Sequence, residues 1–171
     1  VIAAADFARA KNADAIISFG GGTPNDTAKA VTICIAENIS EPDGLDAMRI
    51  KFEYPDKLEI PSLSADPLPM FGIPTTLSAG EFTFFVGITD RARQVKDLYL
   101  DKRITAKCVF LDPDLTLATP ERLWLGTGMR AVDHCIEAMC SSTHQPFTDA
   151  LAYRALDMLV RYLRETKADP K

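Results

Sequence analysis

The chain of 171 residues has no apolar run that approaches the ~18 residues of a membrane span. Its clearest apolar runs, AIIS and VTICIA, have the length of core segments. It also has no excess of basic residues, since 19 Lys and Arg stand against 24 Asp and Glu, giving a formal net charge of -5. A nucleic-acid surface would need a basic stripe, whereas here the two signs are interspersed. We therefore expect neither a membrane nor a nucleic acid as a partner.

Other signals are missing as well. The first residues, VIAAADFARAKNADA, lack the basic and long apolar regions of a signal peptide, and there is no internal repeat or low-complexity tract. No two cysteines form a Cys-x-x-Cys pair, which removes the commonest redox and zinc signature. Apolar or helical contexts surround all four cysteines, which predicts buried thiols in a reducing cytoplasm: Cys34, Cys108, Cys135 and Cys140.

What is present is an average globular composition, with 47% hydrophobic and 25% charged residues. That length and balance suit one ordinary domain or two small ones. The chain begins inside a helix-like segment without an initiating Met, and it ends at RETKADPK after a strong helical pattern. We therefore expect a fragment or a processed piece of a larger enzyme.

The order of elements predicts an α/β part followed by an all-helical part, with the boundary between residues 112 and 119. Apolar periodicity, β-branched runs and proline positions give the individual elements. Helices are expected at 2–11, 24–37, 119–140 and 147–165, parallel strands at 14–19, 69–76 and 106–112, a hairpin at 82–100, and a looser stretch at 40–68 with one short helix near 44–52. The predicted domains are 1–112 and 113–171.

The stretch SFGGGTPNDTAKA, residues 18–30, places three glycines between a strand and a helix. Thr23 is the expected N-cap, with Pro24 at the first helical position and Asp26 at the third. Free amide groups and a partial positive charge at a helix N-terminus favour an anion, and glycines allow its close approach. The pattern is neither G-x-G-x-x-G nor a Walker loop. The alternatives are a plain strand-to-helix turn, and an Asp26 that only caps the helix.

Four segments together resemble the iron-containing alcohol dehydrogenase superfamily, and most of all its maleylacetate reductase branch. They are GGGTPNDTAKAV, PMFGIPTTLSAGEFT, KCVFLDPDLTLATP and TGMRAVDHCIEA, which follow one another in order along nearly the whole chain. The resemblance implies a Rossmann-like parallel-sheet cofactor domain followed by an all-helical domain, the dehydroquinate synthase-like architecture. Family members are roughly twice this length, so domain 1–112 is expected to be incomplete at its N-terminus and domain 113–171 at its C-terminus.

The resemblance also implies a nicotinamide dinucleotide as cofactor, NAD or NADP, with the choice left open. The residue that reads the ribose normally follows an earlier strand, which this chain lacks. By the family pattern, the cofactor-binding positions are Gly20, Gly21, Gly22, Thr23 and Asp26 in the glycine loop, Thr75, Thr76, Leu77 and Ser78 in the second segment, and Lys96 beyond it. On the residues alone, Thr75 and Thr76 read as a strand end whose hydroxyls cap backbone groups, and Lys96 as an exposed hairpin lysine.

The sequence departs from the metal-binding pattern at one position. In metal-dependent members of the family, an Asp lies one helical turn before a His on this helix, and that Asp and His both bind the metal. In this chain the His is kept as His134, but the position of the Asp is occupied by Arg130. Arg130 has no lone pair to donate and repels a cation, and Asp133 lies about 100° round the helix from His134. No metal is expected, and His134 would be a ligand only if one were present.

The reading that follows is a metal-free reductase that transfers hydride from NAD(P)H to a small oxo-acid such as maleylacetate, in aromatic-compound breakdown. Arg130 would bind a substrate carboxylate and His134 would donate the proton. Arg130 paired with Asp133 on a solvated face, and His134 as a satisfied partly buried residue, are the plainer alternatives. His144 is expected to lie at the surface.

The rival functions are a metal-dependent (Fe or Zn) alcohol dehydrogenase and a truncated nucleotide-binding chain without turnover. The family implies a homodimer.

Overall fold

The computed structural model describes residues 1–169, so the last two residues of the predicted domain 113–171 lie outside it. The chain divides into two compact units. The first contains Val1–Pro74 and Gly80–Leu111, and the second contains Thr75–Ala79 and the residues from Asp112 onward. Each unit is described by itself.

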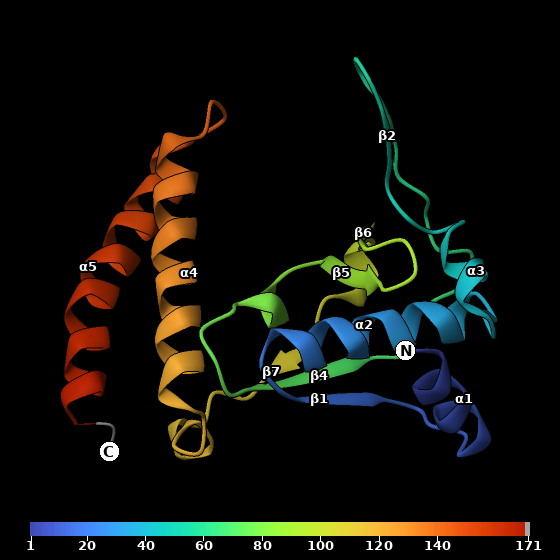
Figure 1. The fold of residues 1–171 in the computed structure, drawn as a ribbon, viewed down its shortest axis with the longest axis horizontal. Coiled ribbons are helices and arrows are strands. Elements are labelled where there is room, and N and C mark those ends of the chain that lie inside the picture. The colour runs from blue at the N-terminus through green and yellow to red at the C-terminus, as the bar shows by residue number, and fades with distance from the viewer. Residues whose placement is uncertain (170–171) are drawn as a thin grey trace. The chain divides into compact units, whose positions relative to one another are not determined.

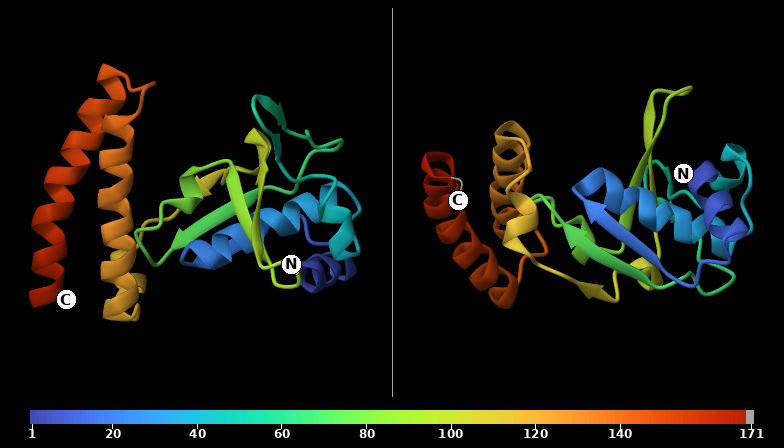
Figure 2. Two further views of the ribbon diagram at one scale, coloured as in Figure 1. Left: turned by 45° about the horizontal axis from the view of Figure 1, so that its top comes forward. Right: turned by 90° about the horizontal axis from the view of Figure 1, so that it is seen from below.

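A parallel three-stranded sheet forms the floor of the first unit, in the order β1-β4-β7. Its strands are β1 (Ile16–Gly20), β4 (Met70–Pro74) and β7 (Cys108–Val109), and Figures 1 and 2 show them side by side. In the register, Ile17 lies opposite Phe71, and Gly72 lies opposite Val109. Parallel strands require crossover connections, which is the α/β arrangement that the sequence predicts.

The first strand is less buried than its β-branched sequence suggests. Ile17 is 67% exposed and Phe19 is 58% exposed, although Ser18 between them is buried. Successive side chains in a strand point to opposite faces, and only one face of β1 is covered here. Within residues 1–169, β1 also pairs on one side only, with β4.

Helix α2 (Gly22–Ala36) is the centre of the first unit and contacts β1, β4 and helix α1 (Ile2–Ala10). Its buried residues Ala30, Ile33 and Cys34 are at most 2% exposed. They share a core with Val86 and Tyr99 of a hairpin formed by β5 (Phe85–Asp90) and β6 (Val95–Leu100). The predicted hairpin is confirmed, with the charged segment Arg91–Gln94 as its turn.

The stretch 40–68 differs from the prediction. Its helix, α3, is one turn long and lies at Pro42–Leu45, so it overlaps only the start of the predicted helix at 44–52. An unpredicted hairpin follows, formed by β2 (Lys51–Glu53) and β3 (Lys57–Glu59). All six strand residues are exposed. Each strand alternates charged and apolar residues, Lys-Phe-Glu and Lys-Leu-Glu, but three residues are too few for that alternation to indicate a strand. Within residues 1–169 there are also three short 3₁₀ turns, at Gly80–Phe82, Lys102–Ile104 and Pro113–Thr116.

The second unit is a helix pair, α4 (Glu121–Cys140) and α5 (Pro146–Ala168), as the sequence predicts. The indole Nε1 of Trp124 donates to Thr166 Oγ1 at 3.1 Å, which joins the start of α4 to the end of α5. Residues Thr75–Ala79 pack against the start of this pair. Thr119 Oγ1 donates to the carbonyl of Thr75 at 2.8 Å, and the amide of Leu77 donates to Thr127 Oγ1 at 3.2 Å.

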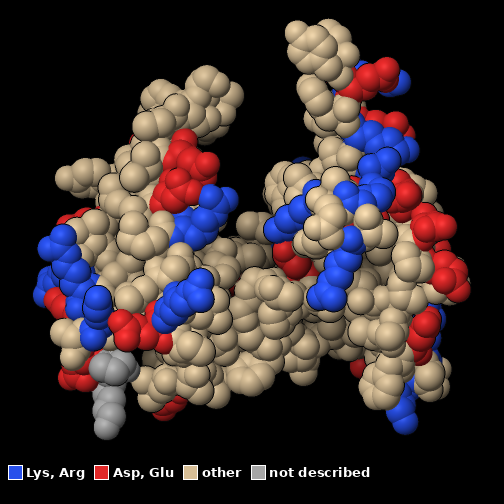
Figure 3. All heavy atoms as spheres, viewed as in Figure 1, with Lys and Arg blue, Asp and Glu red and all other residues tan. Residues whose placement is uncertain are grey.

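Two expectations about the surface can be compared with the structure. Cys34 and Cys135 are buried, but Cys108 and Cys140 are exposed, so the prediction of four buried thiols is half wrong. A short strand and a helix terminus leave those two side chains at the surface. None of the helices in residues 1–169 is long and apolar enough to cross a membrane. Figure 3 shows acidic and basic side chains interspersed on the visible face.

Gly128 lets the two helices of the second unit approach closely. A Cβ at this position would lie 2.4 Å from Leu163 Cδ2, whereas a Cβ at Gly126, two residues earlier, would meet nothing within 4 Å. We expect Gly128→Ala to lower the free energy of unfolding by roughly 1–3 kcal/mol, because it overpacks the helix contact. Gly126→Ala should raise it by about 1 kcal/mol, because alanine favours the helix.

Urea denaturation of both variants measures the difference. If the two substitutions changed stability equally, the close approach at Gly128 would contribute nothing to the packing of α4 and α5.

Candidate functional site

The candidate site in the first unit is the turn that connects β1 to α2. Gly20 ends the strand with φ +136°, a backbone conformation that residues with a side chain rarely adopt. A Cβ on Gly20 would also lie 2.8 Å from Cγ of Pro24. Glycine at position 20 is therefore required by both backbone conformation and space.

The helix begins earlier than the sequence suggests. Gly21 is the N-cap, so the prediction of Thr23 as N-cap is wrong, and no side chain caps the helix. Glycine tolerates the extended cap conformation, and Pro24 fits the first turn because it has no amide to leave unpaired. Asn25 donates the first helical bond, to the carbonyl of Gly21 at 3.2 Å. The amides of Gly22 and Thr23 precede that bond and have no partner inside the helix.

Asn25 is a residue of this turn that the sequence analysis missed. It is 1% exposed, and its Nδ2 donates to the carbonyl of Gly21 at 3.2 Å. Its Oδ1 is buried without a hydrogen-bond partner among the described residues. The only sequence signal was an amide side chain in the first turn of a glycine-led helix, a feature shared by many ordinary helices.

Asp26 does not cap its own helix, so the alternative reading of it as a cap is wrong. Its Oδ2 accepts a hydrogen bond from the amide of Gly87 in β5 at 3.3 Å. Burial raises the pKa of the Asp26 carboxyl, while the Gly87 amide, Lys29 and Lys96 act to lower it. The carboxyl therefore ties the first turns of α2 to the hairpin and lies near two cations.

Lys29 is fully buried and ties α2 to the chain that precedes β5. Its Nζ donates to the carbonyls of Gly80 at 2.5 Å, Thr83 at 2.7 Å and Phe85 at 3.0 Å. Burial lowers the pKa of the ammonium, and the carboxyls of Asp26 and Glu81 act in the opposite direction. The sequence signal for a buried lysine was its position as the one charged residue in the apolar stretch AKAVTICIA. Most of that stretch is buried in the structure.

Glu81 completes this buried polar cluster. The residue is 4% exposed, and burial raises the pKa of its carboxyl. Its Oε2 has no hydrogen-bond partner among the described residues. The ammonium of Lys29 and the carboxyl of Glu81 thus share the low-dielectric space between α2 and the Gly80–Phe85 segment, and the half-buried carboxyl of Asp26 lies near them. Their interactions are stronger there than at the surface.

The second predicted cofactor segment, Thr75–Ser78, lies in the second unit. Thr76 is buried, and its Oγ1 shares a hydrogen bond of 2.8 Å with Ser78 Oγ. The backbone of the segment is held by hydroxyls of Thr119 and Thr127, so its conformation is fixed without a ligand.

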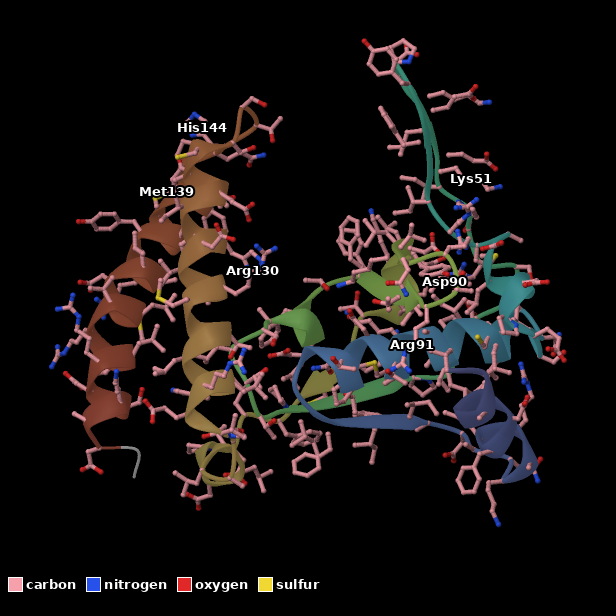
Figure 4. All side chains as sticks on the ribbon, viewed as in Figure 1. Lys51, Asp90, Arg91, Arg130, Met139 and His144 are labelled. Atoms are coloured by element: carbon pink, nitrogen blue, oxygen red, sulfur yellow. The ribbon has the colours of Figure 1, made fainter. Side chains whose placement is uncertain are left out.

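Arg130 and His134 are both exposed on α4. The guanidinium of Arg130 pairs with Asp133, with side chains 59% and 50% exposed, as the plainer alternative expects. Figure 4 shows Arg130 on the side of α4 away from α5. His144 is exposed in the connection between the helices, and its Nδ1 lies 2.8 Å from Asp149 Oδ2.

The structure thus places the predicted residues in two sets. The first unit brings together the glycine turn, Asp26 and Lys96. The second unit contains Thr75–Ser78 together with Arg130 and His134. The binding and catalytic roles of these residues stay predictions.

Comparison with protein families decides the affiliation of the chain. Residues 1–113 match the model described as iron-containing alcohol dehydrogenase, and residues 125–171 match the C-terminal model of the same family. The chain belongs to the iron-containing alcohol dehydrogenase family. The family prediction made from the four sequence segments is confirmed.

Individual members of the family give the scale of the similarity. An NAD-dependent methanol dehydrogenase of Bacillus methanolicus is 34% identical over 167 residues, which are 96% of this chain and 40% of that protein. An NADPH-dependent butanol dehydrogenase of Clostridium saccharobutylicum is 34% identical over 95% of this chain and 40% of its own. The crystal structure of a maleylacetate reductase from Agrobacterium tumefaciens matches with TM-score 0.72 and 24% identity, over 98% of this chain and 39% of its own, and shows the shared fold. The chain spans about 40% of the length of these curated relatives.

The family name implies an iron ion, and the donor set described here does not fit one. Arg130 occupies the helical position one turn before His134, and a guanidinium has no lone pair for a metal. Among residues 1–169, no group of three or more His, Cys, Asp or Glu side chains is arranged to hold a metal ion. We therefore derive no chemical step through iron.

The buried ammonium of Lys29 leads to a stability prediction. Lys29→Met keeps most of the side-chain volume but leaves three carbonyls without their donor, so we expect a loss of about 3 kcal/mol or more in the free energy of unfolding. Lys107→Met is the matched control, because Lys107 is exposed, and it should change stability by less than about 0.5 kcal/mol. Urea denaturation measures both. Equal effects of the two substitutions would show that the hydrogen bonds from Lys29 to the three carbonyls do not stabilise this unit.

Proposed function

We propose that the protein is an NAD(P)H-dependent reductase that transfers hydride to the carbonyl carbon of a small oxo-acid of the maleylacetate kind. One observation carries the proposal: a glycine turn whose free amides open helix α2 directly after a parallel strand. Such a turn accepts the diphosphate of a dinucleotide, because free N–H groups and the helix dipole meet the anion at short range.

The residues of the first unit fit that cofactor. Gly20 has no room for a Cβ, and the amides of Gly22 and Thr23 have no helical partner, so the backbone presents donors with no side chain in the way. Asp26 offers a carboxylate one turn further along α2, and Lys96 of β6 offers an ammonium near it. When bound, the nicotinamide supplies the hydride. NAD and NADP remain alternatives, since the two relatives described above are named for different ones.

The substrate side of the proposal rests on α4. Arg130 presents a fork of N–H donors that matches a carboxylate, and its present partner is an exposed Asp133. An exposed ion pair of this kind contributes only about 0–1 kcal/mol, so a substrate carboxylate can replace it. His134 lies one turn further along the same helix and would donate a proton to the carbonyl oxygen. The proposal includes catalysis without a metal, because Arg130 takes the position of a ligand.

A second candidate is an alcohol dehydrogenase that uses a metal. The observation in its favour is that the relatives at 34% identity are named for methanol and butanol. The family resemblance supports the further proposals of a homodimer and of a role in the cytoplasmic breakdown of aromatic compounds.

One assay separates these functions. Oxidation of NADH and NADPH is followed on a panel of oxo-acids, aldehydes and simple ketones, with and without a chelator, together with metal analysis of the protein. We expect turnover of oxo-acids that the chelator does not reduce. Activity on aldehydes that the chelator abolishes would favour the metal-dependent alternative, and cofactor binding without oxidation would favour a chain without turnover.

A matched pair of arginines tests the substrate contact. Arg130→Ala should raise KM for the oxo-acid by about tenfold or more, because a charge-assisted hydrogen bond is lost. Arg154→Ala is the control, since Arg154 makes the same exposed i,i+3 pair, with Asp157, on α5. If the two variants had the same KM, Arg130 would have no role in substrate binding.

A further inference from the structure

Gly87 in β5 is a glycine whose missing side chain is filled by a lysine. An ideal Cβ on Gly87 would lie 2.2 Å from Cε and 2.9 Å from Nζ of Lys96. In the hairpin register Lys96 faces Thr89, so Gly87 is its diagonal neighbour on the same face. The lysine therefore extends along the strand and crosses it where the glycine leaves room.

Backbone conformation does not explain this glycine. Among the glycines of residues 1–169, only Gly20 has a positive φ, so any residue can adopt the backbone of Gly87. Nor does Gly87 form a turn, because it lies in the middle of β5. The space above the strand is what glycine supplies at this position.

The other side of Gly87 contacts the first turns of α2. Its amide donates to Oδ2 of Asp26 at 3.3 Å. Burial raises the pKa of that carboxyl, and the ammonium of Lys96 is near enough to act in the opposite direction. One glycine thus positions both charged groups. It holds the carboxylate through its amide and leaves open the path that brings the ammonium toward it.

We propose that Gly87 is a positioning residue that directs Lys96 across β5 to Asp26, beside the glycine turn. This inference rests on the proposed function, in which that turn binds a dinucleotide, and it assigns Gly87 to the binding of the cofactor. A side chain at position 87 forces the lysine into another rotamer and removes its ammonium from the site. Lys96 is exposed and only the far end of its flexible side chain is displaced, so the fold itself is unaffected.

A double-mutant cycle tests the proposal, with Gly87→Ala, Lys96→Ala and the double variant compared with the wild type. The dissociation constants of NADH and NADPH are measured by fluorescence titration, and thermal unfolding checks the fold. We expect each single variant to bind about tenfold more weakly, as when one hydrogen bond to a charged group is lost. The double variant should bind no more weakly than Lys96→Ala alone, because the alanine then has no lysine to displace. Gly126→Ala, a glycine substitution in the second unit, should bind as the wild type does.

The outcomes separate the two levels of the proposal. If the wild type bound neither dinucleotide, the proposed function itself would fail. If the wild type bound but Gly87→Ala or Lys96→Ala bound equally well, the positioning role alone would be overturned. A double variant weaker by the product of the single effects would show that Gly87 acts independently of Lys96. Loss of the fold in Gly87→Ala would show that more than a movable lysine fills the space, and would equally overturn the role.

Discussion

The first unit depends on one buried ammonium. Lys29 has no exposed surface, and its three carbonyl partners belong to a segment 51 to 56 residues further along the chain. Burying a charge is unfavourable unless it is fully hydrogen-bonded, and here the backbone before and at the start of β5 supplies the acceptors. The same helix begins, two turns before Lys29, with the free amides of the glycine turn. Helix α2 therefore carries the glycine turn and also holds the β5–β6 hairpin, through Lys29 and Asp26.

Local patterns allowed the main elements to be predicted, and long-range contacts were the part that sequence did not reveal. The glycine turn, the β5–β6 hairpin and the two long helices follow from signals within a few residues of each element. The partner of Asp26 lies 61 residues away, so the sequence suggested a helix cap instead of a bond to Gly87. The β2–β3 hairpin has strands of only three residues, which are too short for their alternation of charged and apolar side chains to indicate a strand. The N-cap is Gly21 instead of Thr23, because the helix begins two residues earlier than the capping pattern indicated.

The candidate site combines a feature shared with the family and one that departs from it. The glycine turn lies in the region matched by the iron-containing alcohol dehydrogenase model. Arg130 departs from the metal-binding pattern, because a fixed positive charge stands at a position for which that pattern implies a ligand. Two cations cannot share one small volume without strong repulsion, and an arginine instead favours an anionic group there. The charge at this one helical position thus distinguishes the chain from the metal-binding pattern of the family.

The close approach of α4 and α5 at Gly128 has a consequence for the residues around it. The side chain of Leu163 in α5 fills the space that Gly128 leaves on α4, and this fit sets the rotational phase of α4 about its axis. Arg130 and His134 are one turn apart, so they share whatever direction that phase gives them. The direction in which both side chains leave the helix is therefore set by Gly128, which has no functional group of its own.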